Sequence, residues 1–306
     1  MTFWAFCQHY QKAIIALEAV APKMDSRTDG SKVKAFLRLF RLGNCAMGAF
    51  GTLLAVIICV GVSGLEQYAL ETAFSMLVVV LFTAGGNALN DYFDREIDRR
   101  AHPERPIPSG KLTPHEVVYV AVALMTLSFA TSLGITAWSV IIVVASIFAM
   151  LAYEMRLKAA GFAGNLMISW LTGALFLFGG AAVGDFSLAW ILAALAILAT
   201  LGREIVKDIQ DMEGDRSSRR TLPMRIGVKS SGIVAAASFV AAVALSPLPY
   251  LEEVFDFWYL PVVAAADGIF IYCALILFQN PERGQKLAKL AMAVALVAFL
   301  VGGVLG

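Results

Sequence analysis

Long apolar stretches alternate with short polar connections from residue 42 to the end of the chain. Each stretch holds about 20 residues, the length that a helix needs to cross the hydrocarbon core of a bilayer. The short connections, many with Gly or Pro, favour helices that run antiparallel to their neighbours. The pattern predicts an all-α, polytopic membrane protein with about nine transmembrane helices in one bundle. The apolar stretches lie near residues 42–63, 72–94, 115–134, 136–154, 161–181, 187–207, 231–248, 259–279 and 285–305.

The residues before the first apolar stretch divide into two parts. Residues 1–32 are predicted to be an N-terminal extension, and the run QHYQK within it disfavours a secretory signal peptide. A flexible tail, a true start at Met24 and a helix lying on the membrane surface are the alternatives for this extension. The following run, KVKAFLRLFRLGN, interleaves basic and apolar residues, which is typical of an interfacial helix leading into the membrane.

The composition narrows the class of protein. Hydrophobic residues make up 59% of the chain and charged residues only 15%, which excludes an ordinary soluble domain. The four cysteines and three histidines show no metal-ligand spacing, so a disulfide framework, a zinc site and a histidine metal centre are not expected. We expect contact with membrane lipids, no nucleic acid partner, and no evident protein partner.

The placement of the basic residues predicts an orientation. With nine spans and an N-terminus inside the cell, all 24 Lys and Arg residues fall on one side of the membrane, and the opposite loops carry only acidic charge. Because cytoplasmic loops are enriched in Lys and Arg, the basic side is predicted to face the cytoplasm. The basic residues occur up to Arg41, in 95–111, at Arg156 and Lys158, and in 203–229 and 283–289.

Two acidic motifs lie at the ends of apolar stretches, on this same side. In each motif four polar side chains are spaced four, three and four residues apart, which predicts one face of a helix. Two carboxylates about 4 Å apart repel by roughly 4 kcal/mol at an effective dielectric of about 20, so several facing one cavity need counter-charge. Oxygen ligands select Mg²⁺ or Ca²⁺ over softer metals, and Mg²⁺ usually takes one or two carboxylates together with substrate phosphates. The motifs are Asn87, Asp91, Asp94 and Asp98, and Glu204, Asp208, Asp211 and Asp215.

A family resemblance follows from these motifs. The run Asn90-Asp91-x-x-Asp94-x-x-x-Asp98 resembles the NDxxDxxxD signature of the UbiA-type intramembrane prenyltransferases, and Asp211-x-x-x-Asp215, with Asp208 before it, resembles their second motif. The resemblance extends from about residue 33 to the end of the chain, so 33–306 is predicted to be an intramembrane prenyltransferase domain whose helices surround a central cavity. The run GNALNDYFDREIDRRAHPERPIPSG most resembles the archaeal branch that acts on geranylgeranylglyceryl phosphate.

The resemblance implies a reaction and its site. The reaction is Mg²⁺-dependent transfer of a geranylgeranyl group from geranylgeranyl diphosphate to the hydroxyl of geranylgeranylglyceryl phosphate, with two ions. An aromatic acceptor of a quinone, chlorophyll or haem pathway is the alternative. The residues expected to carry catalysis are Asp91, Asp94, Asp98, Asp211 and Asp215. The metal ligands are expected among Asn90, Asp94, Asp98, Asp208, Asp211 and Asp215. The residues expected to bind substrates are Arg41, Asn44, Asn90, Arg105, Tyr153, Lys158 and Lys207.

Several of these residues also allow simpler interpretations. Arg41, Tyr153 and Lys158 have the types that anchor helices at membrane interfaces, and Asn90 is suited to a hydrogen bond between helices. The prolines of HPERPIPSGKLTPHE predict an extended loop with no helix, in which Arg105 and Lys111 are suited to a phosphate. Thr113 with the following proline predicts the N-cap of the next helix.

Two other classes of protein also use acidic residues within membranes. Phosphotransferases that act on CDP-linked lipids need a DGxxAR run, which is not assembled here as required. A cation transporter would place its carboxylates near the middle of the bilayer, at broken helices. The two acidic motifs lie instead at the predicted cytoplasmic ends of helices, beside basic loops, which favours the prenyltransferase.

Overall fold

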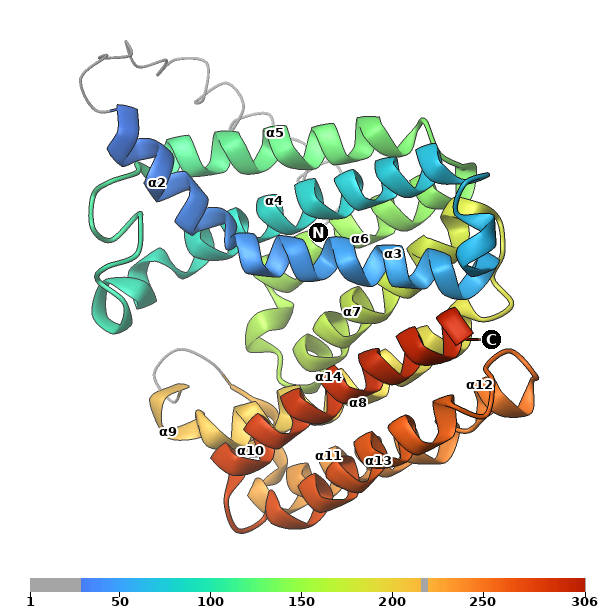
Figure 1. Ribbon diagram of the computed structural model, residues 1–306. Coiled ribbons are helices and arrows are strands. Elements are labelled where there is room, and N and C mark those ends of the chain that lie inside the picture. Colours follow the sequence, from blue (N-terminus) through green and yellow to red (C-terminus); the bar gives the residue numbers. More distant parts are fainter. Residues whose placement is uncertain (1–28, 216–219, 306) are drawn as a thin grey trace, which may run out of the picture. The chain divides into compact units, whose positions relative to one another are not determined.

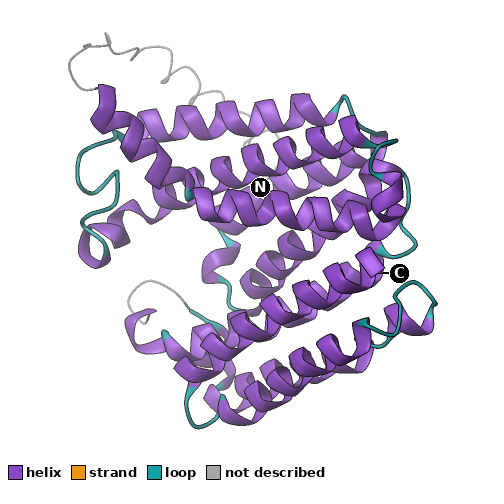
Figure 2. Cartoon of the chain, in the orientation of Figure 1, coloured by secondary structure: helices purple, strands orange, loops and turns teal. Residues whose placement is uncertain are grey.

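The computed structural model describes residues 29–215 and 220–305, and no strand occurs in those two ranges (Figure 2). Most of the predicted N-terminal extension, residues 1–32, lies outside the described residues, so its boundary stays a prediction. The elements, labelled in Figure 1, are α2 (Asp29–Phe40), α3 (Leu42–Gly64), α4 (Ala69–Ala101), α5 (Pro114–Ser132), α6 (Ala137–Met155), η1 (Leu157–Ala159), α7 (Phe162–Val183), α8 (Ala189–Gln210), α9 (Met212–Asp215), α10 (Leu222–Ile226), α11 (Val228–Leu245), α12 (Leu248–Leu251), α13 (Tyr259–Ile276) and α14 (Pro281–Leu305).

Among the described residues, nine helices are long and apolar enough to cross a membrane. They confirm the predicted spans: α3 to α8, α11 continued through α12, α13 and α14. The main difference is α4, which continues to Ala101, beyond the predicted end at residue 94. Large apolar side chains point outward on these helices, including Trp138 and Phe148, each 58% exposed. Exposed apolar area on this scale marks a lipid-facing surface, so the chain is a multi-pass membrane protein.

The chain folds as two compact units, and the division falls within α4 and α5. Unit 1 consists of residues 1–42 and 84–125, and unit 2 consists of residues 43–83 and 126–306. The described part of unit 1 therefore holds α2, the second half of α4, the connection after it and the first part of α5.

Unit 1 is held together by small buried side chains and by polar contacts at helix ends. A Cβ added to Gly85 of α4 would lie 3.2–3.3 Å from atoms of Ala121, Leu124 and Met125, so α4 and α5 approach closely there. The predicted N-cap is confirmed as a capping box. Thr113 Oγ1 accepts from the Glu116 backbone N–H at 3.2 Å, and Glu116 Oε2 accepts from the Thr113 backbone N–H at 2.8 Å.

In unit 2 the helix α8 contributes to two hydrophobic clusters. The first joins α8 to α3, α7, α13 and α14 around Phe176, Tyr259 and Phe299. The second joins the later part of α8 to α10, α11, α13 and α14 around Phe239 and Phe270. Because α8 is buried along its length, the end of this helix, which carries the second acidic motif, has a fixed position within unit 2.

Close backbone approach in unit 2 depends on glycines of α7. A Cβ on Gly179 would lie 2.4 Å from the Cβ of Ala55, and one on Gly173 would lie 2.5 Å from a side-chain carbon of Ile197. Neither site has room for a larger residue. Small residues at such contacts are a common means of packing helices inside a bilayer, where no hydrophobic force drives the helices together.

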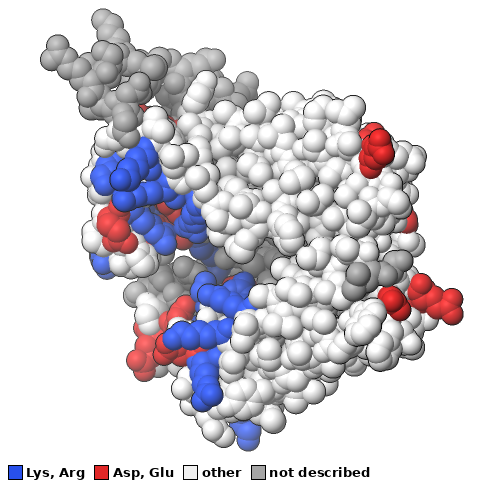
Figure 3. Space-filling model, in the orientation of Figure 1, with Lys and Arg blue, Asp and Glu red and all other residues white. Residues whose placement is uncertain are grey.

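Charge is distributed unevenly along the helices of unit 2. On the face drawn in Figure 3, its Lys and Arg side chains lie near the end of α8 and the beginning of α14, and its opposite connections show only Asp and Glu. The opposite connections contain Glu66, Glu71, Asp185, Glu252, Glu253 and Asp256 and no basic residue. The uneven charge predicted from the sequence is therefore present in the folded unit.

Candidate active site

The first acidic motif lies on the second half of α4, in unit 1. The helix is unbroken from Ala69 to Ala101, so the predicted helical face is confirmed. Asp91 and Asp98 are buried, each 4% exposed, whereas Asp94 and Asn90 are partly exposed. Buried carboxylates are costly unless they are paired and hydrogen-bonded. Their partners therefore decide whether this face is stable.

Arg41 supplies one counter-charge. Its Nη2 lies 2.6 Å from Asp91 Oδ1 and 3.5 Å from Asn90 Oδ1, the latter at the outer limit of a hydrogen bond. Arg41 has φ of 51°, a left-handed backbone conformation that is uncommon for a residue other than glycine. The end of α2 is fixed beside it, because Asn87 Nδ2 donates to the backbone carbonyl of Phe40 at 2.8 Å. The turn at Arg41 thus positions the guanidinium group on the acidic face.

Arg105 supplies the second counter-charge. Its Nη1 lies 2.6 Å from Asp98 Oδ2 and 3.6 Å from Asp91 Oδ1. One guanidinium group therefore contacts two buried carboxylates that are nearly two helical turns apart. This arrangement relieves the like-charge repulsion within the motif, so the acidic face is stable as part of unit 1.

The connection that carries Arg105 is not extended, and that prediction was wrong. Residues 102–113 fold into successive turns. The backbone N–H of Ser109 donates to the backbone carbonyl of Arg105. The backbone N–H groups of Lys111 and Leu112 both donate to the carbonyl of Pro106. The φ that proline fixes is also compatible with turns, and Gly110, with φ of 73°, supplies the left-handed position that closes the last one. Folding the connection back brings Arg105 to Asp98 and places Lys111 near α2.

The second acidic motif differs from its prediction. Its four acidic residues do not share one helix, because α8 ends at Gln210 and Asp211 is its C-cap, with φ of −90° and ψ of 2°. The apolar run ends at Ile209, and the next residues, which include Gly214, have no apolar face to bury and poor helix propensity. A short helix, α9, then ends at Asp215, whose side chain lies outside the described part.

Asp208 and Asp211 lie at this end of α8, both partly exposed. Asp208 Oδ2 accepts a hydrogen bond from Asn165 Nδ2 at 2.9 Å, and Asn165 is itself buried. Glu204 pairs with its neighbour Arg203. A neutral amide is therefore among the partners of Asp208, whereas Asp91 and Asp98 both contact guanidinium groups.

A third cluster joins the end of α6 to η1. Lys158 Nζ lies 3.1 Å from Glu154 Oε2 and 5.8 Å from the ring centroid of Tyr153. The Glu154 side chain is only 1% exposed, so this ion pair is largely shielded from water. Sequence reasoning selected Tyr153 and Lys158 but missed Glu154, although its position four residues before Lys158 was a signal for the pair.

The remaining predicted residues are not brought into these clusters. Asn44 and Lys207 are exposed, and neither side chain makes a hydrogen bond or ion pair within the ranges that the structure describes. Of the basic residues that follow the second motif, Arg216 and Arg219 lie outside the described residues, and Arg220 is exposed.

The donor set fits magnesium better than a softer metal. In residues 29–215 and 220–305, no group of three or more His, Cys, Asp or Glu side chains is arranged to hold a metal ion by itself. Magnesium does not require such a group, because it keeps waters and usually binds one or two carboxylates together with substrate phosphates. The two motifs offer only carboxylate and amide oxygens, and the imidazole nearest to them in the sequence, His102, is exposed and lies 3.6 Å from Glu104. They therefore fit Mg²⁺ when a phosphate substrate completes its coordination.

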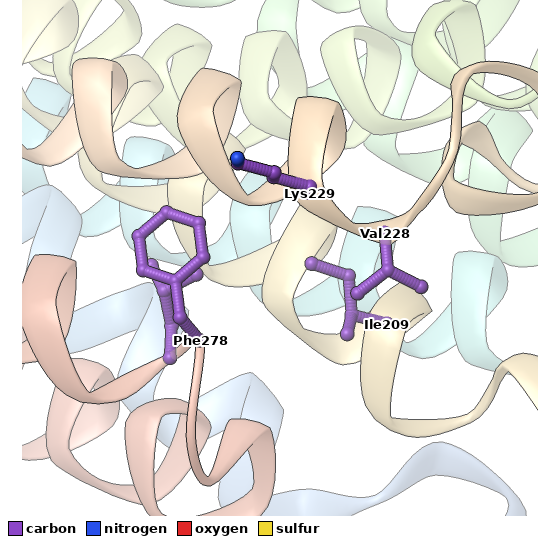
Figure 4. A pocket seen from close by; sticks show the side chains of 5 residues that line it. Ile209, Val228, Lys229 and Phe278 are labelled. Atoms are coloured by element: carbon purple, nitrogen blue, oxygen red, sulfur yellow. The ribbon is translucent and has the colours of Figure 1, made fainter.

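A cavity of about 490 Å³ in unit 2 lies apart from these polar groups (Figure 4). It is lined by Ile209, Val228, Lys229, Leu277 and Phe278. Ile209 follows Asp208 by one residue, so their side chains leave α8 about 100° apart, and neither Asp208 nor Asp211 lines the cavity. This cavity does not belong to the acidic site.

The family model of the UbiA prenyltransferase family matches residues 43–300. The chain belongs to this family. It is therefore a prenyltransferase, and the predicted family and class of enzyme are confirmed. The family match also agrees with the nine apolar helices, since both indicate a multi-pass membrane protein.

Relatives with assigned names match nearly the whole chain. The digeranylgeranylglyceryl phosphate synthase of Natronomonas pharaonis is 38% identical over 273 residues, which cover 89% of this chain and 97% of the relative. The synthase of the same name from Methanosarcina mazei is 40% identical over 289 residues, covering 88% and 98%.

Solved structures share the fold. A structure described as that of digeranylgeranylglyceryl phosphate synthase in membranes matches with a TM-score of 0.79 and 37% identity, over 90% of this chain and 99% of that one. A UbiA homologue from Archaeoglobus fulgidus, bound to DMAPP and Mg²⁺, has a TM-score of 0.62 at 17% identity, over 87% and 99%. At that identity the second likeness shows the fold alone.

Proposed function

We propose that this enzyme transfers a geranylgeranyl group from geranylgeranyl diphosphate to the hydroxyl of geranylgeranylglyceryl phosphate, forming the second ether bond of an archaeal membrane lipid. Support for the substrates comes from relatives named for this product, which the chain matches over nearly their full length. The structural observation that carries the proposal is the first motif, where the buried Asp91 and Asp98 are held by Arg41 and Arg105.

The acidic residues would hold Mg²⁺, and we propose two ions. Bound Mg²⁺ supplies positive charge that stabilises the diphosphate leaving group as its bond to the prenyl carbon breaks. Asp94 is partly exposed beside the two buried carboxylates, and Asp208 and Asp211 are partly exposed at the end of α8, so their oxygens are accessible to ligands. The proposed ligands are Asn90, Asp94, Asp98, Asp208, Asp211 and Asp215.

The basic residues would bind the diphosphate. Arg41 and Arg105 each keep N–H groups beyond those that contact Asp91 and Asp98, because a guanidinium group has five. Those free donors suit phosphate oxygens, which they can bind in pairs. Lys158 is a further candidate, with Tyr153 beside it, and Asn44 and Lys207 are exposed and accessible to substrate.

The prenyl group is transferred directly to the acceptor, with no covalent enzyme intermediate. The acceptor hydroxyl oxygen forms a bond to C1 of the prenyl chain, the C1–O bond to diphosphate breaks, and the hydroxyl proton goes to a base. We propose a carboxylate of Asp91, Asp94 or Asp98 as that base. Asp91 and Asp98 are each oriented by an arginine, so their positions are set before substrate binds.

The reaction is proposed to occur on the cytoplasmic side. The uneven charge of unit 2 supports this orientation, since Lys and Arg are enriched on cytoplasmic faces. A cysteine introduced at Ser187 or at Lys286, in a variant without the native cysteines, tests it with a reagent that cannot cross membranes. In whole cells Ser187→Cys should react and Lys286→Cys should not, and the reverse pattern would contradict the orientation.

The chemistry is tested with the purified full chain in nanodiscs, supplied with both substrates and Mg²⁺. The expected product is the diether lipid phosphate, detected by mass spectrometry, and chelation of Mg²⁺ should abolish it. A parallel set of hydroxylated aromatic acceptors tests the alternative acceptor class. Product from an aromatic acceptor alone, or product unaffected by chelation, would contradict the proposal.

A further inference from the structure

A small polar pocket lies in unit 1, apart from the acidic face of α4. It has a volume of about 120 Å³ and lies between α2 and the folded connection after α4. Lys and Arg side chains gather around α2 in Figure 3. The pocket is lined by Ser31, Lys34, Ala35, Arg38, Glu104, Pro106 and Lys111.

The backbone positions of the three basic residues of this pocket are fixed by packing and by hydrogen bonds. Lys34 and Arg38 are four residues apart on α2, so they lie on the same face of that helix. Ala35 and Leu39 of the same helix are buried, at 2% and 0% exposure, which fixes its rotation. Lys111 follows the turns around Pro106, to which its backbone N–H donates at 3.1 Å.

The charges of this pocket do not balance. Of the described residues that line it, three are cations and one, Glu104, is a carboxylate that already lies 3.6 Å from His102 Nδ1. Within the side chains that the structure describes, Lys34, Arg38 and Lys111 form no ion pair. Like charges gathered around one small space repel one another, so this set is suited to an anion from outside the chain.

The size and charge of the pocket fit one phosphate group. A single water needs only about 10–15 Å³ of such a volume, so the pocket has room for one phosphate group together with some of its water. A phosphate monoester carries a charge of about −1.5 to −2 at neutral pH and three strong acceptor oxygens. Three cations against one carboxylate match that charge.

We infer that Lys34, Arg38 and Lys111 bind the phosphate monoester of the lipid acceptor, and so select an acceptor that carries a phosphate. This inference rests on the proposed function and adds to it a phosphate site on unit 1 other than Arg41 and Arg105. The same chemistry occurs in anionic lipids of the bilayer, so the experiment has to separate the two sources.

The test compares kinetics of Lys34→Gln, Lys111→Gln and the double variant with wild type, in nanodiscs of zwitterionic lipid and, in parallel, in nanodiscs that also contain anionic lipid. Because these side chains are exposed and partly screened, each substitution should raise the acceptor KM about tenfold, with donor KM and kcat within about twofold of wild type. Lys34→Arg should retain most of the affinity. Lys286→Ala is the matched control, since it removes an exposed lysine of unit 2 that pairs with Glu282.

A second measurement avoids turnover. Binding of the acceptor and of the same lipid without its phosphate is measured by native mass spectrometry, with no donor present. Wild type should prefer the phosphorylated lipid, and the double variant should lose that preference while its thermal unfolding stays unchanged.

The outcomes separate the possibilities. Unchanged acceptor KM in the double variant, or an equal rise in donor KM, would overturn the inference while leaving the proposed function standing. If the variants differ from wild type only in how their kcat depends on anionic bilayer lipid, with no change in acceptor KM, the pocket binds those lipids. That result would also overturn the inference. If wild type makes no diether, the proposed function itself has failed.

Discussion

The two acidic motifs have the same spacing in the sequence, yet the structure gives them different surroundings. In unit 1, Asp91 and Asp98 are buried on an unbroken helix and are matched by arginines. In unit 2, Asp208 and Asp211 are partly exposed at the end of α8, and Asp208 accepts a hydrogen bond from the neutral amide of Asn165. Equal spacing therefore fixes neither how far the helix extends nor how deeply these side chains are buried.

The largest expected effect is on activity, and it should be the same for both motifs. Asp94→Asn and Asp211→Asn keep the shape of the side chain and remove its charge, so each should lower kcat/KM by about 10³-fold, as loss of a key electrostatic group does in other enzymes. Product formation by the purified full chain measures this. Activity within tenfold of wild type for either variant would show that the corresponding motif is dispensable.

Stability should separate the motifs. Asp98→Ala leaves Arg105 without its closest partner in a mostly buried site, which should lower the free energy of unfolding by about 2 kcal/mol; the usual loss is larger, but Arg105 is 28% exposed. Asp211→Ala, at a partly exposed helix end, should cost under about 1 kcal/mol.

Thermal or denaturant unfolding in detergent measures these two variants. The double variant Asp98→Ala with Arg105→Ala should recover part of the loss, because it leaves no unpaired charge. Equal losses for Asp98→Ala and Asp211→Ala would contradict the distinction between the two motifs.

A smaller effect is expected from changing the type of cation. Arg105→Lys keeps the charge but cannot contact Asp91 and Asp98 together with a planar fork, so donor kcat/KM should fall about tenfold. Arg99→Lys is the matched control on the same unit, because Arg99 is 64% exposed and pairs only with Glu96 at the surface. Equal behaviour of the two variants would assign Arg105 a nonspecific role.

The smallest effect is expected at Asn165. Asn165→Ala removes one neutral hydrogen bond to Asp208, typically about 1 kcal/mol, and should lower activity about threefold to tenfold. Asn165→Asp should lower activity further, since it places a second carboxylate beside Asp208. Steady-state kinetics of both variants provides the measurement, and an Asn165→Asp variant as active as wild type would show that Asp208 does not need a neutral donor.

Periodicity was enough to predict the helices, because a membrane span needs a fixed length and an apolar composition. The face of α4 and the cap at Thr113 were also predictable, since both depend on spacing within a few residues. The burial of Glu154 was not predictable, because it depends on neighbouring residues that the spacing does not specify. The end of α8 was predicted wrongly because the acidic spacing continues past the last apolar residue, Ile209, where nothing remains to bury.

The folded connection after α4 was missed for a related reason. Proline excludes helix, but it does not distinguish an extended chain from a series of turns, and the backbone hydrogen bonds to Pro106 decide between them. The pocket beside Lys34 depends on that folding, because Lys111 reaches α2 only when the connection turns back. Local sequence patterns therefore did not predict the contacts between segments that are distant in the sequence.

The carboxylate of Glu116 contacts two different elements of unit 1. One oxygen accepts from Thr113 in the capping box, and the other lies 2.8 Å from Lys32 Nζ on α2. The first turn of α5 and the lie of the surface helix α2 are thereby coupled through one side chain. Any motion that frays the start of α5 would loosen the docking of α2 at the same moment, so this edge of unit 1 should open as a single cooperative step.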